Sequence, residues 1–125
     1  RMAGGPPEAN PDYANYAYLS AIGALKSFVC IDNEEDKKVL GYATFFIQVH
    51  PHHKDKIFAT SCTFYIAPKK RKGMLGYRFI QFCETGLKAA GADYIQLVMN
   101  SNFPVDSFLQ RLNYTPSDTI YIREI

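Results

Sequence analysis

The sequence predicts a single mixed α+β domain, close to the α/β class, with one sheet flanked by helices. Its 125 residues suit one domain, and 47% hydrophobic with 21% charged residues is typical of a folded globular protein. Two adjacent strand-like segments predict an antiparallel hairpin. A later strand–helix–strand segment predicts a parallel pair with a right-handed crossover. We therefore expect a mixed sheet.

The first third of the chain predicts a lead-in, a helix and a hairpin. Residues 1–11 are rich in Gly, Pro, Ala and Asn, which is typical of a flexible segment. Residues 12–24 predict an amphipathic helix that stops at Gly23. Its apolar side chains recur at helical spacing: Tyr13, Tyr16, Leu19 and Ile22. Residues 25–33 and 39–49 predict two strands joined by a charged turn.

The middle of the chain predicts a loop, a strand and a long helix. Residues 50–55 form a polar segment that contains a proline, and residues 56–67 predict a third strand. Pro68 marks the end of that strand because it has no backbone N–H to donate. A helix follows over residues 74–90, and Gly91 suits its C-terminal cap. We expect one apolar face on this helix: Leu75, Phe79, Phe82, Cys83 and Leu87.

The C-terminal part predicts a second strand–helix segment and a final strand. Residues 93–99 have the pattern of a short buried strand, and residues 104–112 predict a short helix. Residues 114–125 predict the last strand or strands, interrupted at Pro116. No apolar run is close in length to the roughly 20 residues that a membrane-spanning helix needs. Nothing at the start resembles a signal peptide, and the chain begins with Arg1, as a fragment, a processed form or a tagged protein would.

Charge and cysteine content limit the classes of function. The net charge is only +2, but residues 54–90 hold eight Lys and Arg against two Asp and Glu. Positive charge gathered on one segment can build a site for an anion. The three cysteines, Cys30, Cys62 and Cys83, include no close pair. This spacing argues against a disulfide framework and a four-thiolate zinc site, and favours a reducing, cytoplasmic compartment.

The turn after the third strand carries the strongest functional signal. Residues 68–76 read Pro-Lys-Lys-Arg-Lys-Gly-Met-Leu-Gly and lead from a strand into a helix. The first N–H groups of a helix lack intrahelical partners and carry partial positive charge, so they favour phosphate. Gly73 and Gly76 would allow a close backbone approach. The alternative is that Lys69 to Lys72 are simply a solvated basic face. The spacing matches neither the Walker A nor the dinucleotide-binding pattern.

Residues 64–84 resemble motif A of the GNAT N-acetyltransferases, in which a strand ending near a proline leads into a glycine-containing loop and a helix. Further motifs resemble a small group of GNAT proteins common in bacteriophage genomes and their hosts. These motifs are Arg71-Lys-Gly-x-x-Gly76, Phe45-Phe46, His50-x-His52-x-x-Asp55 and the helix from Asp106 to Tyr114. The resemblance covers residues 19–125 approximately. It implies a mostly antiparallel sheet with a central parallel pair that splays apart.

The resemblance also implies a cofactor and its site. In this family the strand before motif A binds the pantetheine arm of acetyl-CoA through its backbone, and the loop amides bind the pyrophosphate. An asparagine opens the last helix. The residues implied here are Tyr65, Ile66, Ala67, Arg71, Lys72, Gly73, Met74, Leu75, Gly76 and Asn102.

The sequence departs from the family pattern at several positions. The family's first strand and helix have no counterpart before residue 12, where only the lead-in precedes. The usual general-acid tyrosine of the last helix falls on Leu109. An acidic residue that often acts as general base falls on Cys62, and Asn113 replaces a glycine. Acetyl-CoA binding is therefore better supported than catalysis.

Three residues are candidates for the catalytic chemistry. His50 and His52 match the family's histidine segment, and histidine titrates near neutral pH, as a general base should. The three cysteines are predicted to be buried apolar residues, and the alternative for Cys62 is that it lines the substrate side of the third strand. Two other interpretations of the histidines remain open: an exposed loop without a role, and a metal site with Asp55. A zinc site needs three or four ligands, so no metal is predicted.

Two classes of function follow from these patterns. The first is an N-acetyltransferase that moves acetyl from acetyl-CoA to a primary amine, on a small molecule, a protein or a modified nucleotide. The alternative is a non-catalytic acyl-CoA-binding or interaction module with the same fold. Nucleic-acid binding is disfavoured because the basic residues form one loop rather than a surface. The resemblance leaves the oligomeric state open, with a homodimer as one alternative. It also implies a location in the cytoplasm, which would be the host cytoplasm if the protein is viral.

Overall fold

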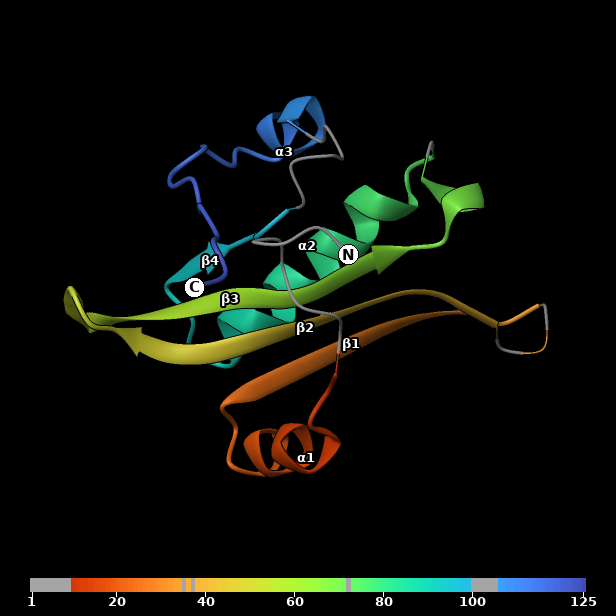
Figure 1. Cartoon of the computed structure of the whole chain (residues 1–125). Coiled ribbons are helices and arrows are strands. Elements are labelled where there is room, and N and C mark those ends of the chain that lie inside the picture. The colour runs from red at the N-terminus through yellow and green to blue at the C-terminus, as the bar shows by residue number, and fades with distance from the viewer. Residues whose placement is uncertain (1–9, 35, 37, 72, 100–105) are drawn as a thin grey trace.

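The computed structural model describes residues 10–34, 36, 38–71, 73–99 and 106–125. Within these residues one sheet has the strand order β1-β2-β3-β4 (Figure 1). The strands are β1 (Leu25–Asp32), β2 (Lys38–His50), β3 (His53–Ile66) and β4 (Tyr94–Gln96). The helices are α1 (Tyr13–Ala21), α2 (Leu75–Ala89) and α3 (Asp106–Arg111), with a short 3-10 turn, η1 (Pro68–Lys70). The first three strands pair antiparallel and β3 pairs parallel with β4, which confirms the mixed sheet.

The core lies between α2 and one face of the sheet. Buried residues of α2 recur every three or four positions, as an amphipathic helix requires: Gly76, Phe79, Ile80, Cys83 and Leu87. They meet the inward-facing residues of β2 and β3: Ala43, Phe45, Ala59 and Ile66. Phe82, expected on this apolar face, is 61% exposed and lies edge-on against Phe28 of β1. Ile80 takes the buried position instead.

The strand register shifts at three places, one of them at the β2–β3 turn between Val49 and His50. Thr44 pairs with Thr63 while Phe45 pairs with Ser61, so Cys62 is an extra residue on β3 with no Cα partner on β2. A second shift follows Cys30 of β1. A β-bulge of this kind bends its strand and turns a side chain away from the regular alternation. The bulge at Cys62 therefore gives this thiol an exposed position in the middle of β3.

All three helices end in the same hydrogen-bond arrangement, the Schellman motif. After α1, Gly23 N donates to Ser20 O and Ala24 N donates to Leu19 O. The equivalent pairs after α2 are Gly91 N to Lys88 O and Ala92 N to Leu87 O; after α3 they are Asn113 N to Gln110 O and Tyr114 N to Leu109 O. The residue that ends each helix has a positive φ: 78° at Gly23, 99° at Gly91 and 65° at Asn113. Asn113 is the one of these three residues that is not a glycine, and asparagine tolerates the left-handed conformation better than most other residues do.

Several expected elements differ from those observed. Helix α1 is shorter than predicted and contains no buried residue, and it lies at the edge of the sheet next to β1 (Figure 1). The predicted loop 50–55 is a two-residue turn, because His50 ends β2 and His53 begins β3. Strand β4 covers three residues of the predicted seven. No helix among the described residues is long and apolar enough to cross a membrane.

The predicted strand over residues 114–125 is wrong. This segment has no helix or strand assignment, and its large apolar side chains are exposed: Ile120, Tyr121, Ile122 and Ile125. A run of β-type residues forms a strand only when a neighbouring strand accepts its backbone hydrogen bonds. Pro116 further removes one N–H donor from the start of the segment.

Asn113→Ala should lower the free energy of unfolding by about 1 kcal/mol, because alanine pays the full cost of the left-handed conformation. Asn113→Gly should leave stability unchanged or raise it slightly. Chemical denaturation of both variants measures this difference. Gln110→Ala, at an exposed position within α3, is the matched control and should change little. Equal stability of the alanine and glycine variants at position 113 would contradict the assignment.

Candidate active site

The central feature of the site is the separation of the two parallel strands. Backbone pairing between β3 and β4 ends at Thr60 and Gln96, whose side chains are joined by a 2.9 Å hydrogen bond from Thr60 Oγ1 to Gln96 Oε1. Two residues after the end of β4, Val98 N donates to the side-chain Oγ of Ser61, at 2.8 Å, instead of to the β3 backbone. Beyond this point the chain that follows β4 diverges from β3 (Figure 1). A gap therefore opens beside the C-terminal half of β3.

The backbone groups that face the gap can be identified from the hydrogen-bond register. Ala67 N donates to Leu40 O across β2, at 2.7 Å. Because successive residues of a strand direct their backbone groups to opposite edges, Tyr65 also bonds toward β2. Phe64 and Ile66 therefore direct their N–H and C=O groups to the gap. Of the three strand residues predicted to bind the cofactor, Ile66 faces the gap, whereas Tyr65 and Ala67 direct their backbone groups to β2. Phe64, which the sequence pattern did not indicate, also faces the gap.

The end of β3 is held by contacts around Tyr65 and Arg71. The ring of Tyr65 stacks on Tyr42 of β2, with centroids 5.1 Å apart. The Arg71 guanidinium lies 5.7 Å from the centroid of the Tyr65 ring, and Arg71 Nε donates to Ile66 O at 2.8 Å. One carbonyl that faces the gap thus binds the side chain of the following loop. These contacts fix the direction in which the chain leaves the strand.

The loop between β3 and α2 places the N-terminus of α2, which carries partial positive charge, at the end of the gap. The first hydrogen bond within α2 runs from Arg78 N to Met74 O, at 3.1 Å, so the amides of Leu75, Gly76 and Tyr77 have no acceptor inside the helix. No side chain caps this terminus. Exposed basic residues, Lys69 to Arg71, precede it. Amide dipoles and side-chain charge together favour an anion here.

The two glycines of the loop have different surroundings. A Cβ at Gly73 would meet nothing within 4 Å, so this position is open to a ligand. A Cβ at Gly76 would lie 3.2 Å from the ring of Phe108, which packs over the start of α2. Gly76 is therefore required for packing against α3 rather than for ligand approach alone. Lys72 and Asn102, also expected to bind the cofactor, lie outside the described residues.

A tyrosine and a cysteine meet where the gap begins. The Tyr16 hydroxyl of α1 lies 3.4 Å from Cys62 Sγ, at the bulge of β3. Next to them, Thr44 Oγ1 and Thr63 Oγ1 are hydrogen bonded at 2.7 Å. The hydrogen bond to Cys62 is the main cause of a raised pKa for Tyr16. Sequence reasoning placed Cys62 on the third strand but gave no sign that Tyr16 would reach it.

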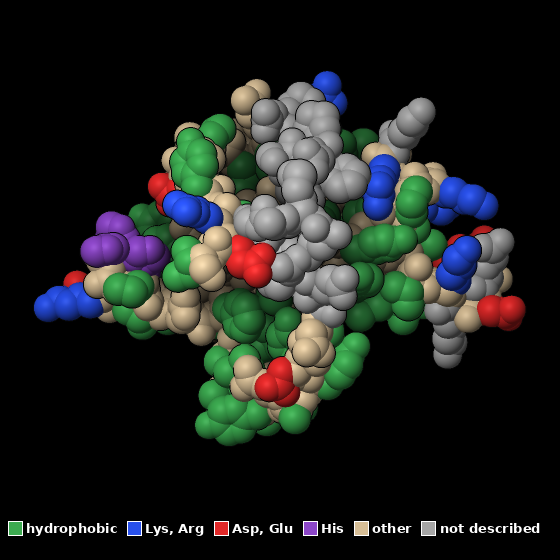
Figure 2. Space-filling model, viewed as in Figure 1, with side chains coloured by type: hydrophobic (Ala, Val, Ile, Leu, Met, Phe, Trp, Pro, Cys, Tyr) green, Lys and Arg blue, Asp and Glu red, His purple; other side chains and the backbone are tan. Residues whose placement is uncertain are grey.

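The histidines lie at the opposite end of the sheet. His50, His52 and His53 surround the β2–β3 turn, where the ring of His50 lies 4.9 Å from that of Phe58 and His52 N donates to His50 Nδ1. Figure 2 shows them gathered at one end of the molecule. Cys62 lies nine residue steps along β3 from His53, which corresponds to about 30 Å. His50 and His52 therefore do not share a site with Cys62. No group of metal-binding side chains was found among the described residues.

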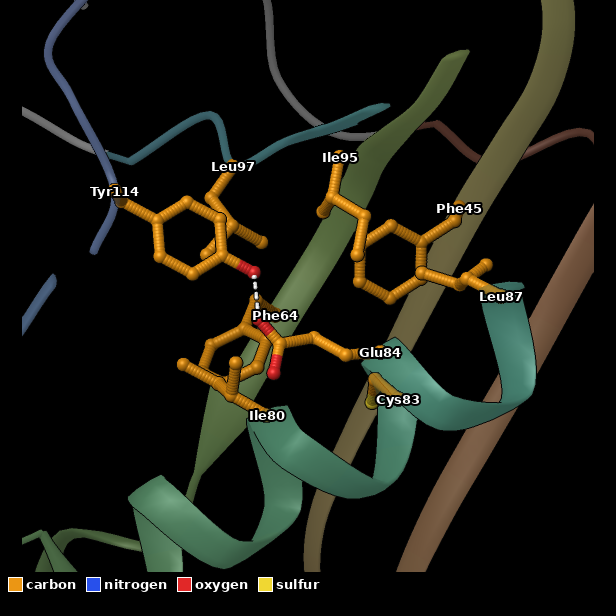
Figure 3. A pocket seen from close by; sticks show the side chains of 9 residues that line it. All are labelled: Phe45, Phe64, Ile80, Cys83, Glu84, Leu87, Ile95, Leu97 and Tyr114. Atoms are coloured by element: carbon orange, nitrogen blue, oxygen red, sulfur yellow. Dashed lines mark hydrogen bonds between the residues drawn. The ribbon is translucent and has the colours of Figure 1, made fainter. Parts of the chain in front are cut away.

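A small apolar hollow lies between α2 and the sheet, lined by nine residues (Figure 3): Phe45, Phe64, Ile80, Cys83, Glu84, Leu87, Ile95, Leu97 and Tyr114. Tyr114 donates to Glu84 Oε2 at 2.8 Å. Burial, followed by this bond to a carboxylate, raises the pKa of Tyr114. Burial also raises the pKa of Cys83 to about 12. These groups are neutral parts of the core, and the Tyr114 hydroxyl is committed to Glu84.

Comparisons with known proteins show the family of this chain. The model of the acetyltransferase (GNAT) family matches residues 3–114, so the chain belongs to this family. No curated protein matches the sequence.

Solved structures show the same fold at low identity. An acetyltransferase from Trypanosoma brucei is 16% identical, with a TM-score of 0.69 over 93% of this chain and 80% of that one. A transcriptional regulator from Bacillus halodurans is 14% identical, with a TM-score of 0.73 over 87% and 71%. Glucosamine-6-phosphate N-acetyltransferase from Arabidopsis thaliana is 12% identical, with a TM-score of 0.68 over 87% and 73%.

The free energy of unfolding should fall as pH rises from 9 toward 12. An unfolded cysteine releases its proton near pH 9, whereas folded Cys83 holds its proton up to about 12, so the unfolded state gains relative stability across this range. Cys83→Ala should be less stable at pH 8 but should show a shallower dependence on pH. Denaturant titrations at several alkaline pH values measure the slope. Cys30→Ala, at a half-buried thiol of β1, is the control; a slope that is unchanged in Cys83→Ala would refute the prediction.

Proposed function

We propose that this protein transfers the acetyl group of acetyl-CoA to a primary amine. One observation carries the proposal: the gap beside β3 leads directly into the uncapped, basic start of α2. A gap lined by backbone donors and acceptors suits an amide-containing arm, and a helix start rich in free N–H groups suits pyrophosphate. The motifs of residues 64–84, and the further resemblance to the small phage-type members, support the same cofactor.

The proposed cofactor position follows the strand. The pyrophosphate would bind the amides from Gly73 to Gly76, with Arg71 and the neighbouring lysines supplying charge. The pantetheine arm would run back along β3 and bond to Phe64 and Ile66, the residues that face the gap. From Ala67 to Cys62 the extended strand spans about 17 Å. An arm laid along it brings the thioester to the bulge at Cys62.

The proposed reaction is direct attack on the thioester. The amine nitrogen forms a bond to the acetyl carbon, the carbon–sulfur bond breaks, and the electron pair leaves on the CoA sulfur. The amine loses one proton and the thiolate gains one, so the reaction needs no other co-reactant. The acceptor is an amine of a small molecule or of a protein. The chain supplies binding energy and orientation through the gap and the loop.

Acetyl-CoA at about 100 times its dissociation constant should add roughly 2.7 kcal/mol to the free energy of unfolding, which for this size raises Tm by on the order of 10 °C. Gly73→Asp should abolish the shift, because its carboxylate would repel the pyrophosphate at a position where a side chain meets no protein atom. Gly73→Asn, equal in size but neutral, should keep most of it. Differential scanning fluorimetry with acetyl-CoA, CoA and ATP measures the effect.

The thermal melt of the wild-type protein, together with the amine panel, also distinguishes acetyl transfer from non-catalytic binding of acyl-CoA. Absence of a shift with acetyl-CoA or CoA would contradict the proposed cofactor. A shift without transfer to any amine in a broad panel would support the non-catalytic acyl-CoA-binding module instead.

The double variant His50→Ala/His52→Ala should retain acetyl transfer within about twofold of wild type, because both rings lie at the turn about 30 Å along β3 from the bulge. Transfer to an amine panel, followed by release of free CoA thiol, measures this. A loss of more than tenfold with acetyl-CoA binding intact would restore the histidines as bases.

A further inference from the structure

The contact between α1 and β3 brings a hydroxyl to the bulge. Tyr16 reaches across from α1, and its oxygen lies 3.4 Å from Cys62 Sγ. Its helix neighbours Tyr13 and Tyr18 are 76% and 62% exposed. Tyr16 is therefore the tyrosine of α1 that the fold directs toward β3.

The bulge coincides with the start of the gap. Cys62 follows Ser61, whose hydroxyl accepts a hydrogen bond from the Val98 amide where the chain after β4 turns away from β3. An acyl-CoA arm running back from the loop of α2 along β3 ends at this point. A thioester sulfur placed beside Cys62 Sγ lies within reach of the Tyr16 hydroxyl. In the structure the hydroxyl lies 3.4 Å from Cys62 Sγ, and either atom can be the donor of this hydrogen bond.

We propose that Tyr16 is the catalytic residue that donates a proton to the sulfur of CoA as the thioester breaks. This inference rests on the proposed function and assigns one of its steps. As the amine nitrogen bonds to the acetyl carbon, the carbon–sulfur bond breaks and its electron pair stays on sulfur. The Tyr16 O–H proton passes to that sulfur and gives free CoA thiol. The proton lost by the amine restores the hydroxyl through solvent.

Two further features fit this role. A tyrosine hydroxyl ordinarily keeps its proton at neutral pH, and the hydrogen bond to Cys62, followed by the charge of Cys62, raises the pKa of Tyr16 in the same direction. Other tyrosines near the gap are engaged elsewhere: Tyr114 donates to Glu84, and Tyr65 stacks on Tyr42 under Arg71. Leu109, at the position of the family's usual acid, carries no proton to donate.

The test compares Tyr16→Phe with wild type in acetyl transfer to the best amine of the panel. A lost proton donor should lower kcat by on the order of 100-fold, while the thermal shift with acetyl-CoA stays unchanged. Tyr18→Phe, the same change on an exposed position of α1, is the matched control and should stay within twofold.

A second acyl donor distinguishes proton donation by Tyr16 from a purely structural role of this residue. Phenyl thioacetate releases an aryl thiolate, which leaves without needing a proton. With this donor, kcat of Tyr16→Phe should lie less than about threefold below that of the wild type, because protonation of a good leaving group contributes little to the rate. A purely structural role for Tyr16 would lower kcat equally with both donors, and that result would overturn the proposal.

Cys62→Ala tests whether Tyr16 acts only by fastening α1 to β3. The proposal expects this variant to lose less than tenfold in kcat, since the proton donor remains. A loss equal to that of Tyr16→Phe would overturn it, as would a Tyr16→Phe enzyme with wild-type kcat. Wild-type protein that binds acetyl-CoA but acetylates no amine would overturn the proposed function, and this inference with it.

Discussion

The parting of β3 and β4 after Thr60 and Gln96 is the constraint on which the site depends. A sheet normally satisfies every backbone donor and acceptor of its inner strands. Here the second half of β3 pairs with β2 alone, so Phe64 and Ile66 present polar backbone groups to a space that another molecule can fill. The Ser61 hydroxyl sustains the divergence because it accepts Val98 N in place of a β3 carbonyl.

The packing of α2 fixes the other end of this space. Its buried face presses on Ala43, Phe45 and Ala59, so the helix cannot rotate without losing the core. The start of α2 consequently points to the end of the gap, and Phe108 of α3 closes over Gly76. The positive helix terminus and the gap thus form one continuous site, although the eight residues 67–74 separate β3 from α2 in the sequence.

Local patterns predicted much of the fold because they report interactions between near neighbours. The hairpin, the long helix over residues 74–90 and the stop signals at Gly23 and Gly91 all depend on spacing and backbone conformation within a few residues. The prediction of a strand over residues 114–125 was wrong because strand formation is not local. The side chains of this segment favour a strand, but pairing requires a partner strand from elsewhere in the chain. The exposed helix α1 shows that apolar spacing alone does not ensure burial.

The sequence by itself determined the mixed sheet, the basic loop between β3 and α2, and the family to which these motifs are similar. Only the tertiary structure decided which groups meet. It placed Tyr16 beside Cys62, 46 positions away along the chain, and moved His50 and His52 to the far end of the sheet. The physical reason is that strand register, bulges and helix packing set distances between remote residues. These distances result from the whole core and cannot be read from any single segment.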